Sequence, residues 1–511
     1  MFDLGRSFLA SAERSPDATA VVDGDIRLTY AGWMDRVLRI VGAFDDLGLK
    51  RGDCVATALQ NTWEMATIHW ACQMAGIMAA PLNWRVKAEE LDFILPNASA
   101  RLIVFQDVSA DAVAGSAAAS ALPQVTVGGE TAGPAIPFSR LLENRPAEAS
   151  PRAGADDLSL LLYTSGTTGK PKGVPRRHRA ERAAALAHVA QNCYAFAERT
   201  LGVMPLYHTM GIRSLLSMAL IDGCFACLPK FDAAEALRMI EREKLTCLYL
   251  VPTLYHDLLA HPRFAETDIS PVRKLGFAGA PMTDGLIRRV EQAFRPEMFV
   301  NHYGSSEVYT FTINQKAAWK PGAAGKAALN QRIRVIKLGS SDPDDLAAPG
   351  EEGQIVADLA GDEAFEGYLN RPDADAKSLH AGWYFTGDTG SFDADGDLFV
   401  TGRVDDMIIT GGENVSPVEV ENVLSLCDGV LEVAVAGLPD ERWGQKVVAF
   451  LRRGSGIDAD ALDAHCRTSG LANFKRPREY VFLDEVPKSP VGKILRRKLQ
   501  AGEYRLEAGS S

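Results

Sequence analysis

The chain has 511 residues, of which 47% are hydrophobic and 23% are charged, and its formal net charge is -12. This length and composition are typical of a globular protein with about two to four domains, each able to bury a sizeable core. The negative charge argues against non-specific nucleic-acid binding, so we expect no nucleic-acid partner and chemistry on small molecules instead.

The sequence shows no signal for export or for a membrane. No positively charged segment followed by an apolar stretch opens the chain, and no apolar run approaches the roughly 18 residues of a membrane span. The eight cysteines are thinly spread, as in proteins whose thiols stay reduced. Cys224 and Cys227 form a C-x-x-C pair in an apolar stretch, so we expect them in the core rather than on a metal. We therefore predict a cytoplasmic protein with no membrane partner.

The N-terminal half alternates helical and strand patterns. Residues 28–85 contain a strand pattern at 55–59 and then a helical pattern through Met65, His69 and Met74, which is typical of βαβ units. Residues 109–121 are rich in Ala and Ser and are expected to form a surface helix or loop. Further strand patterns at 158–163, 201–204, 247–251 and 274–278 alternate with helices. The predicted fold class is α/β, with a large sheet layered by helices.

The most informative stretch is the run 164–173, which reads Thr-Ser-Gly-Thr-Thr-Gly-Lys-Pro-Lys-Gly. Its glycines let the backbone approach a ligand, its hydroxyls and N–H groups donate hydrogen bonds, and its lysines add positive charge. It is not a Walker A loop, because two residues separate Gly166 from Gly169 and Pro171 follows Lys170. A polar surface turn is the alternative. We favour a cradle for a nucleotide triphosphate.

A separate unit is predicted at the C-terminal end. Residues 393–397 read Asp-Ala-Asp-Gly-Asp and predict a tight turn between short strands. Beyond Arg403 the pattern gives a strand, a helix that starts near Ser416 and Pro417, and a strand at 433–436. We therefore expect a large N-terminal domain at 1–404 and a compact α+β domain at 405–511.

Six further motifs follow the cradle at wide separations: residues 206–211 (LYHTMG), 303–307 (YGSSE), 384–388 (YFTGD), 402–406 (GRVDD), 411–414 (GGEN) and 490–493 (PVGK). Together with the cradle, this ordered set resembles the adenylate-forming superfamily of acyl-CoA synthetases, luciferases and peptide-synthetase adenylation domains. Residues 204–208, 402–409, 442–445 and 474–477 are most similar to the aryl-CoA ligases of the 4-chlorobenzoate type. The resemblance covers nearly the whole chain. It implies layered sheets and a small β-barrel in the N-terminal domain, a mobile C-terminal lid, and in some relatives a homodimer.

The resemblance implies ATP, Mg²⁺ and CoA as the cofactors and a carboxylic acid as the substrate. The acid would first react with ATP to give an acyl-adenylate, and the adenylate would then react with CoA. Glu307 would ligate Mg²⁺, Asp388 and Arg403 would bind the ribose or phosphate, Tyr303 would stack on adenine, and Lys493 would stabilise charge during adenylation. The implied nucleotide-binding set is Thr164, Ser165, Gly166, Thr167, Thr168, Gly169, Lys170, Lys172, Gly279, Ala280, Pro281, Asn301, His302, Tyr303, Gly304, Ser305, Ser306, Asp388, Arg403 and Lys493, and the implied catalytic set is Thr164, His208, Glu307 and Lys493.

The resemblance also implies that the lid rotates about Asp405 between the two half-reactions. Gly411 and Gly412 would then line the channel for the pantetheine arm. The nucleotide end of CoA would be gripped by two guanidinium groups and two aromatic rings, which belong to Arg85, Trp443, Phe474 and Arg476. Alternatively, Arg85 and Arg476 could each form an ion pair at the surface.

The acyl pocket is expected between the helix after the cradle and the segments that follow the central strands, with Ala187, Met204, His208, Thr209, Met210, Gly211, Gly279 and Ser305 as its lining. These residues are mostly small or apolar, which suits a flat aromatic or short hydrophobic acid. A dicarboxylate would need a cation, for which Arg213 is the candidate, although Arg213 could also face outward. In the aryl-CoA ligases that the chain resembles, an aromatic side chain often projects from the helix after the cradle. Here residues 183–187 read Ala-Ala-Ala-Leu-Ala, a departure that implies a roomier pocket. Two alternatives are a fatty-acyl-CoA ligase and a catalytically silent binding protein on the same scaffold.

Overall fold

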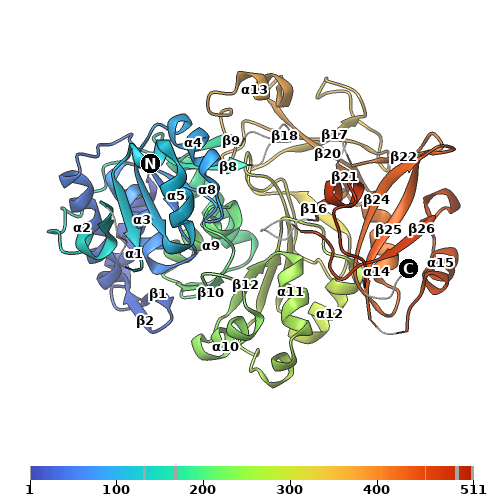
Figure 1. Ribbon diagram of the computed structural model, residues 1–511, viewed down its shortest axis with the longest axis horizontal. Helices are drawn as coiled ribbons and strands as arrows, with labels where there is room; N and C mark the ends of the chain where they lie inside the picture. The colour runs from blue at the N-terminus through green and yellow to red at the C-terminus, as the bar shows by residue number, and fades with distance from the viewer. Residues whose placement is uncertain are drawn as a thin grey trace.

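The computed structural model describes residues 2–129, 134–164, 171–403, 406–454, 456–488 and 494–507. The mixed α/β fold agrees with the predicted class. Figure 1 shows the N-terminal third at one end of the molecule (blue to cyan), the α10–α12 region beside it (green), and the C-terminal sheet at the opposite end (orange to red). Within the described ranges, none of the helices combines the length and apolar character needed to cross a bilayer.

The first sheet has seven strands in the order β7-β6-β5-β3-β4-β8-β9. Its strands are parallel except for the last pair, in which β8 and β9 run antiparallel with Thr164 opposite Lys172. The predicted cradle therefore connects the two strands of a hairpin. The strands are β3 (Cys54–Ala58), β4 (Met78–Pro81), β5 (Ala100–Gln106), β6 (Gln124–Val127), β7 (Ile136–Pro137), β8 (Leu158–Thr164) and β9 (Lys172–Arg177).

The second sheet has 14 strands, and its parallel part holds the central strands in the order β14-β13-β12-β10-β11-β1. Because these strands are parallel, the segments that follow them meet at one edge. This part comprises β1 (Thr19–Asp23), β10 (Arg199–Gly202), β11 (Cys224–Cys227), β12 (Cys247–Leu250), β13 (Lys274–Phe277) and β14 (Met298–Tyr303), with β2 (Ile26–Thr29) antiparallel beside β1.

Antiparallel strands continue the second sheet where the family resemblance implies a small barrel. Their hydrogen-bonded order runs β17-β18-β20-β21-β16-β15 and joins β14. They bring Asp388 of β20 opposite Arg403 of β21. The strands are β15 (Thr312–Asn314), β16 (Ala323–Ala327), β17 (Ile333–Lys337), β18 (Gly353–Asp358), β19 (Leu379–His380), β20 (Trp383–Phe392) and β21 (Leu398–Arg403).

Helices cover the first two sheets and bury most of the core. The helix α3 is buried from Met65 to Ala75, and its Trp70 stacks on Phe8 with ring centroids 4.5 Å apart. The helices are α1 (Leu4–Arg14), α2 (Tyr30–Asp46), α3 (Trp63–Ala75), α4 (Ala88–Asn97), α5 (Ala110–Gly115), α6 (Ala117–Ser120), α7 (Phe138–Leu141), α8 (His178–Gln191), α9 (Thr209–Leu220), α10 (Ala233–Glu243), α11 (Pro252–Ala260), α12 (Asp284–Phe294) and α13 (Pro372–Ser378), with 3-10 turns η1 (Asp107–Ser109) and η2 (Pro262–Glu266).

The C-terminal part is a compact α+β unit with a sheet and core of its own. Ser416 caps the helix that begins at Pro417, as the sequence predicts. The elements are β22 (Ile408–Thr410), β23 (Glu413–Val415), β24 (Val430–Asp440), β25 (Gly444–Arg453), β26 (Glu479–Phe482), α14 (Pro417–Ser425), α15 (Ala459–Thr468), η3 (Asn473–Lys475) and α16 (Arg496–Gln500).

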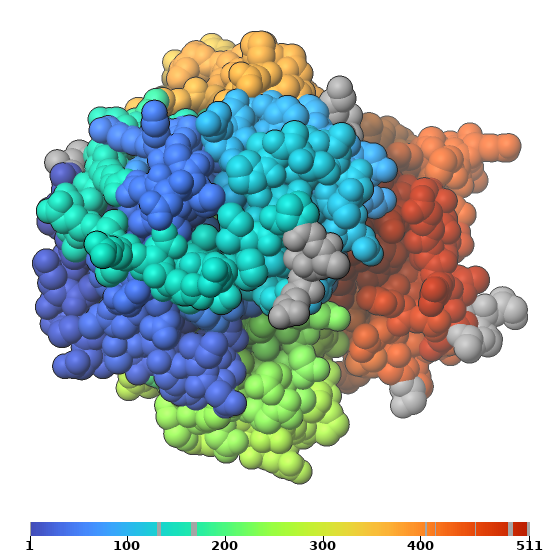
Figure 2. Space-filling model, turned by 60° about the vertical axis from the view of Figure 1, so that its left-hand side comes forward, coloured from blue at the N-terminus to red at the C-terminus, as the bar shows by residue number. Residues whose placement is uncertain are grey.

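The C-terminal part packs against the rest of the chain through α14, which contacts α12 and β21. A Cβ atom on Gly285 of α12 would lie 2.6 Å from the carbonyl oxygen of Ser425, so this approach requires glycine. Figure 2 shows the C-terminal residues (orange to red) as a flank beside the blue and cyan N-terminal residues. The predicted boundary between Val404 and Asp405 lies outside the described residues.

Two sequence predictions about local structure are confirmed. Cys224 and Cys227 are free and buried in β11, and burial raises the pKa of Cys224 to about 11. The aspartates of the turn at 393–397 surround the Lys320 ammonium group, with Nζ 2.6, 2.9 and 2.6 Å from Asp393, Asp395 and Asp397. Lys320 thus occupies the centre of this acidic cluster and offsets part of its negative charge.

Candidate adenylation site

Three predicted nucleotide-binding residues meet where β14, β20 and β21 come together. The Tyr303 hydroxyl donates a hydrogen bond to Asp388 Oδ2 (2.5 Å), and Arg403 donates one to Asp388 Oδ1 (2.9 Å). Burial and the neighbouring Asp388 carboxylate raise the pKa of Tyr303 well above its usual value, so the hydroxyl stays protonated and donates. Asp388 is therefore a fixed acceptor where these strands meet.

Glu307 lies beyond the end of β14 and is mostly buried. Its Oε1 accepts a hydrogen bond from the Tyr368 hydroxyl (2.7 Å), and the Lys172 ammonium group lies 4.6 Å from the centroid of the Tyr368 ring. Burial lowers the pKa of Lys172, and attraction to Glu307 opposes that shift. The Glu307 carboxylate thus lies near Lys172, which begins the second strand of the hairpin that carries the predicted cradle. A hard carboxylate oxygen at this place suits Mg²⁺.

A buried ion pair holds Glu307 in position. Arg176 of β9 and Glu181 of α8 have fully buried side chains, with Nε 2.8 Å from Oε1. Arg176 also donates to the Glu307 carbonyl oxygen (2.9 Å). The Tyr309 hydroxyl donates to Glu181 (2.8 Å). Sequence reasoning missed Arg176, Glu181 and Tyr368. None of the three belongs to a recognisable motif, and their roles follow only from contacts with residues distant in sequence.

The turn between Tyr303 and Glu307 depends on Gly304. A Cβ atom at this position would lie 1.6 Å from the Tyr309 carbonyl oxygen, a distance that no side chain tolerates. We expect Gly304→Ala to shift the turn, to lower the free energy of unfolding by about 1–3 kcal/mol or more, and to abolish activity. Gly470→Ala is the matched control, since no atom lies within 4 Å of its Cβ position. Equal melting temperatures for the two variants in a thermal scan would contradict this account.

His208 caps the helix that follows the LYHTMG motif. Its Nδ1 accepts from the Met210 N–H (3.5 Å), and α9 begins at Thr209. Gly211 allows the helix to approach the preceding loop, since its Cβ would lie 2.2 Å from the Pro205 carbonyl oxygen. The Asn61 amide, which sequence reasoning missed, fixes the same loop by donating to the Met204 carbonyl oxygen (2.7 Å).

The remaining candidates near the strand ends are placed as follows. Met210 and Gly279 are neighbours, because a Cβ on Gly279 would lie 3.6 Å from the Met210 sulfur, and Gly279 has φ +83°. Asn301 donates to the Ala323 carbonyl oxygen (3.0 Å). The His302 side chain is buried and contacts Asn192 at 3.1 Å. Ala280, Pro281, Ser305 and Ser306 follow β13 and β14 at the same edge, Thr164 ends β8, and Ala187 and Met204 are buried.

The CoA candidates lie in two separate places. The Arg85 guanidinium lies 3.6 Å from the Trp84 ring centroid, close to Tyr207 and α4. The other five belong to the C-terminal part, at the opposite end of the view in Figure 1. There Gly411 donates to the Trp443 carbonyl oxygen (2.8 Å), and Gly411 and Gly412 are exposed. Phe474 is partly exposed and Arg476 faces Asp463 at 3.7 Å.

Several predicted residues lie outside the described ranges. They are the cradle residues Ser165, Gly166, Thr167, Thr168, Gly169 and Lys170, the hinge residue Asp405, and Lys493.

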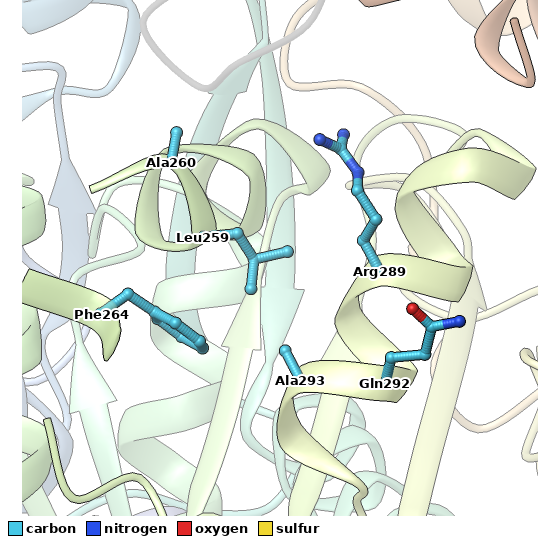
Figure 3. Close-up of a pocket in the computed structure, with 6 residues that line it drawn as sticks. All are labelled: Leu259, Ala260, Phe264, Arg289, Gln292 and Ala293. Atoms are coloured by element: carbon cyan, nitrogen blue, oxygen red, sulfur yellow. The ribbon is translucent and has the colours of Figure 1, made fainter. Parts of the chain in front are cut away.

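One cavity, of about 380 Å³, lies away from these residues. It is lined by Leu259, Ala260, Phe264, Arg289, Gln292 and Ala293. Figure 3 shows Leu259 of α11 pointing toward α12, which contributes Arg289 and Ala293. None of the predicted site residues lines it, so we do not assign it to the acyl group.

The chain matches a known family. The chain fits the family model of AMP-binding enzymes over residues 8–369 and that of the AMP-binding enzyme C-terminal domain over residues 419–493. It therefore belongs to the AMP-binding enzyme family, which confirms the resemblance drawn from the motifs.

Relatives of the chain are CoA ligases. It is 34% identical over 496 residues to 4-chlorobenzoate–CoA ligase of Arthrobacter sp., a match that covers 96% of this chain and 93% of that protein. It is 31% identical over 506 residues to the long-chain-fatty-acid–CoA ligase FadD13 of Mycobacterium tuberculosis, covering 98% of each chain. The structure of the anthranilate CoA ligase AuaEII in complex with anthranoyl-AMP aligns with a TM-score of 0.91 and 26% identity over 98% of this chain and 97% of that one.

Proposed function

We propose that this protein is an ATP-dependent carboxylate–CoA ligase of the cytoplasm that acts on an aromatic or other small ring acid. The observation that carries the proposal is the convergence of Tyr303, Asp388 and Arg403 beside the buried Glu307, in a chain that belongs to the AMP-binding enzyme family. The whole-length similarity to a 4-chlorobenzoate–CoA ligase supports the substrate class. The eight free cysteines support a reducing compartment.

The first half-reaction makes the acid a better electrophile. A carboxylate oxygen attacks the α-phosphorus of ATP, and pyrophosphate leaves with the electrons of the broken P–O bond. Catalysis comes mainly from holding the reactants in line and neutralising charge. The Glu307 carboxylate would hold Mg²⁺, which neutralises phosphate charge when bound. Asp388 accepts hydrogen bonds from the ribose hydroxyls, and Lys172, Lys493 and the cradle bind the phosphates.

The second half-reaction transfers the acyl group to sulfur. The CoA thiol, having lost its proton, attacks the acyl carbon, and AMP leaves. Arg85 belongs to the N-terminal part and Trp443, Phe474 and Arg476 to the C-terminal part, so movement of the lid would change how these residues are placed around one CoA molecule. We propose that residues 405–511 form this lid and rotate about Asp405 between the two steps.

A substrate panel tests the proposal. Pyrophosphate release and thioester formation are measured with benzoates, cinnamates, furoate, malonate and fatty acids, with and without CoA. The proposal predicts CoA-dependent thioester formation with a ring acid. A kcat/KM that rises with chain length would instead favour the fatty-acyl-CoA ligase suggested by the similarity to FadD13. Absence of pyrophosphate release with every acid would favour a silent binding protein.

Removal of the Asp388 carboxylate tests the nucleotide site. Asp388→Ala deletes a charged acceptor of hydrogen bonds. Loss of such a bond costs about 1.5–3 kcal/mol, so we expect kcat/KM for ATP to fall by about 10- to 150-fold. Asp395→Ala is the control, because this exposed aspartate contacts only the Lys320 cluster among the interactions named above. Initial rates at varied ATP measure both variants. An unchanged kcat/KM for Asp388→Ala would exclude Asp388 from nucleotide binding.

A further inference from the structure

A buried polar cluster lies at the carboxyl ends of the central strands, where β12 and β14 face α8 and α9. It consists of His188, Asn192, Arg213, Tyr249 and His302, which we call the polar floor. The ring centroids of His188 and His302 are 5.1 Å apart, and Tyr249 lies 4.6 and 5.1 Å from the two histidine rings. Each of the five side chains is at most 3% exposed. Buried polar groups of this kind require hydrogen-bond partners.

Asn192 sets the tautomer of both histidines. Its amide nitrogen lies 2.8 Å from the His188 carbonyl oxygen, which accepts from it, and 3.1 Å from His188 Nδ1. This orientation turns the amide oxygen toward His302 Nε2, at 3.1 Å. His188 Nδ1 is therefore an acceptor and His302 Nε2 a donor. Burial lowers the pKa of both histidines well below the usual value, and the positive charge of Arg213 adds to the effect, so both rings are neutral.

The second nitrogen of each ring has no partner among the described residues. In His188 this atom is Nε2, which carries the proton and donates. In His302 it is Nδ1, which carries the lone pair and accepts. The polar floor thus offers one donor and one acceptor on neighbouring rings, whose centroids are 5.1 Å apart, and a single group that both accepts and donates could serve the two.

Arg213 adds a positive charge to the floor. The sequence left open whether this residue faces outward, and the structure buries it. Its guanidinium lies 5.1 Å from the Tyr309 ring centroid, and its Nε has no hydrogen-bond partner in the part of the chain that is described. A cation at this place favours an oxygen that can accept a hydrogen bond.

The polar floor adjoins the region where the acyl group is expected. His188 follows Ala187 on α8, and His302 precedes Tyr303 on β14. Arg213 lies on the same helix as Met210, whose sulfur approaches Gly279. The nucleotide candidates Tyr303 and Asp388 bond to each other just beyond the end of β14. An acid whose carboxylate reaches the nucleotide would therefore direct its other end toward the floor.

We propose that the polar floor selects a ring acid that carries a hydroxyl group, which accepts a hydrogen bond from His188 Nε2 and donates one to His302 Nδ1. This inference rests on the proposed function and narrows its substrate class. An alkyl chain or an unsubstituted ring would leave three buried polar nitrogens unpaired. A second carboxylate would accept from His188 and Arg213 but would face the lone pair of His302 Nδ1. A hydroxyl satisfies both histidines because it donates and accepts.

Matched pairs of acids test the inference in the wild-type enzyme. We measure kcat/KM for thioester formation with benzoate against its three monohydroxy isomers, and with cinnamate against its three ring-monohydroxy isomers. The inference predicts that at least one hydroxy acid exceeds its parent by about 10- to 100-fold. Thioester formation without such a preference would overturn this inference and leave the proposed function standing. No product from any acid, fatty acids included, would overturn both.

Three variants locate the selectivity. In His188→Leu and in His302→Leu, the ratio of kcat/KM for the hydroxy acid to that for its parent should fall to about one. His69→Leu is the matched control, because His69 is also buried with both nitrogens unpartnered among the described residues, but lies on α3 beside Trp70. It should keep the wild-type ratio. If a folded His302→Leu enzyme kept the wild-type preference for the hydroxy acid over its parent, the assignment of the hydroxyl to the polar floor would be overturned. If that variant fails to fold, the comparison of acids in the wild-type enzyme remains the test.

Discussion

Replacing Lys493 with alanine is expected to slow acyl-adenylate formation by about 100- to 1,000-fold, the usual cost of losing one group that stabilises charge in the transition state. The same change should leave the transfer of the acyl group from a preformed adenylate to CoA nearly intact, because the lid would carry Lys493 away from the site before that step. Pyrophosphate release measures the first half-reaction. A synthetic acyl-adenylate incubated with CoA measures the second.

Lys498→Ala provides the control for this prediction. Lys498 is an exposed lysine of α16, close in sequence to Lys493, and its ammonium group lies 4.0 Å from Glu503. Both half-reactions should proceed at the wild-type rate in this variant. If Lys493→Ala slowed the two half-reactions equally, the proposal that each half-reaction uses a different lid position would be wrong.

The second large effect is expected on stability. Glu181→Ala leaves the Arg176 guanidinium buried without its carboxylate partner, and breaking such a buried pair costs about 3–5 kcal/mol. Arg176 also fixes the Glu307 backbone and lies 4.0 Å from the Tyr309 ring centroid. We therefore expect a lower melting temperature together with weaker Mg²⁺-dependent activity. Thermal unfolding and rates at varied Mg²⁺ measure the two consequences.

Glu366→Ala is the matched change at the surface. Glu366 is half-exposed and pairs with Arg177 and Arg179 at 2.5 and 2.8 Å. Exposed pairs of this kind contribute about 0–1 kcal/mol. A drop in melting temperature as large for Glu366→Ala as for Glu181→Ala would show that the burial of the Arg176–Glu181 pair does not determine its importance.

The sequence predicted the fold class and much of the site because the chemistry of phosphate and ribose binding requires particular residue types in short motifs. The YFTGD and GRVDD motifs specify Asp388 and Arg403, which the structure places on adjacent strands. The Ser-Pro start of α14 and the turn at 393–397 were predictable for a related reason. Capping and tight turns depend on neighbours in sequence.

The polar floor could not be predicted in the same way. His188 and His302 are 114 positions apart, and each taken alone reads as an ordinary core histidine. Only the shared contact with Asn192 assigns one ring a free donor and the other a free acceptor. Arg213 was ambiguous because the helix that carries it is buried on all sides from Thr209 to Ala219, so no amphipathic pattern indicates which way a given side chain points.

The most direct test of the proposed chemistry follows one oxygen atom. A ring acid that the substrate panel identifies is labelled with ¹⁸O at both carboxylate oxygens and incubated with the enzyme, ATP, Mg²⁺ and CoA. The mass of the AMP product is then measured by mass spectrometry. Attack of the carboxylate on the α-phosphorus predicts one ¹⁸O atom in AMP for each thioester formed. Label in inorganic phosphate or pyrophosphate, or AMP without label, would contradict the acyl-adenylate route.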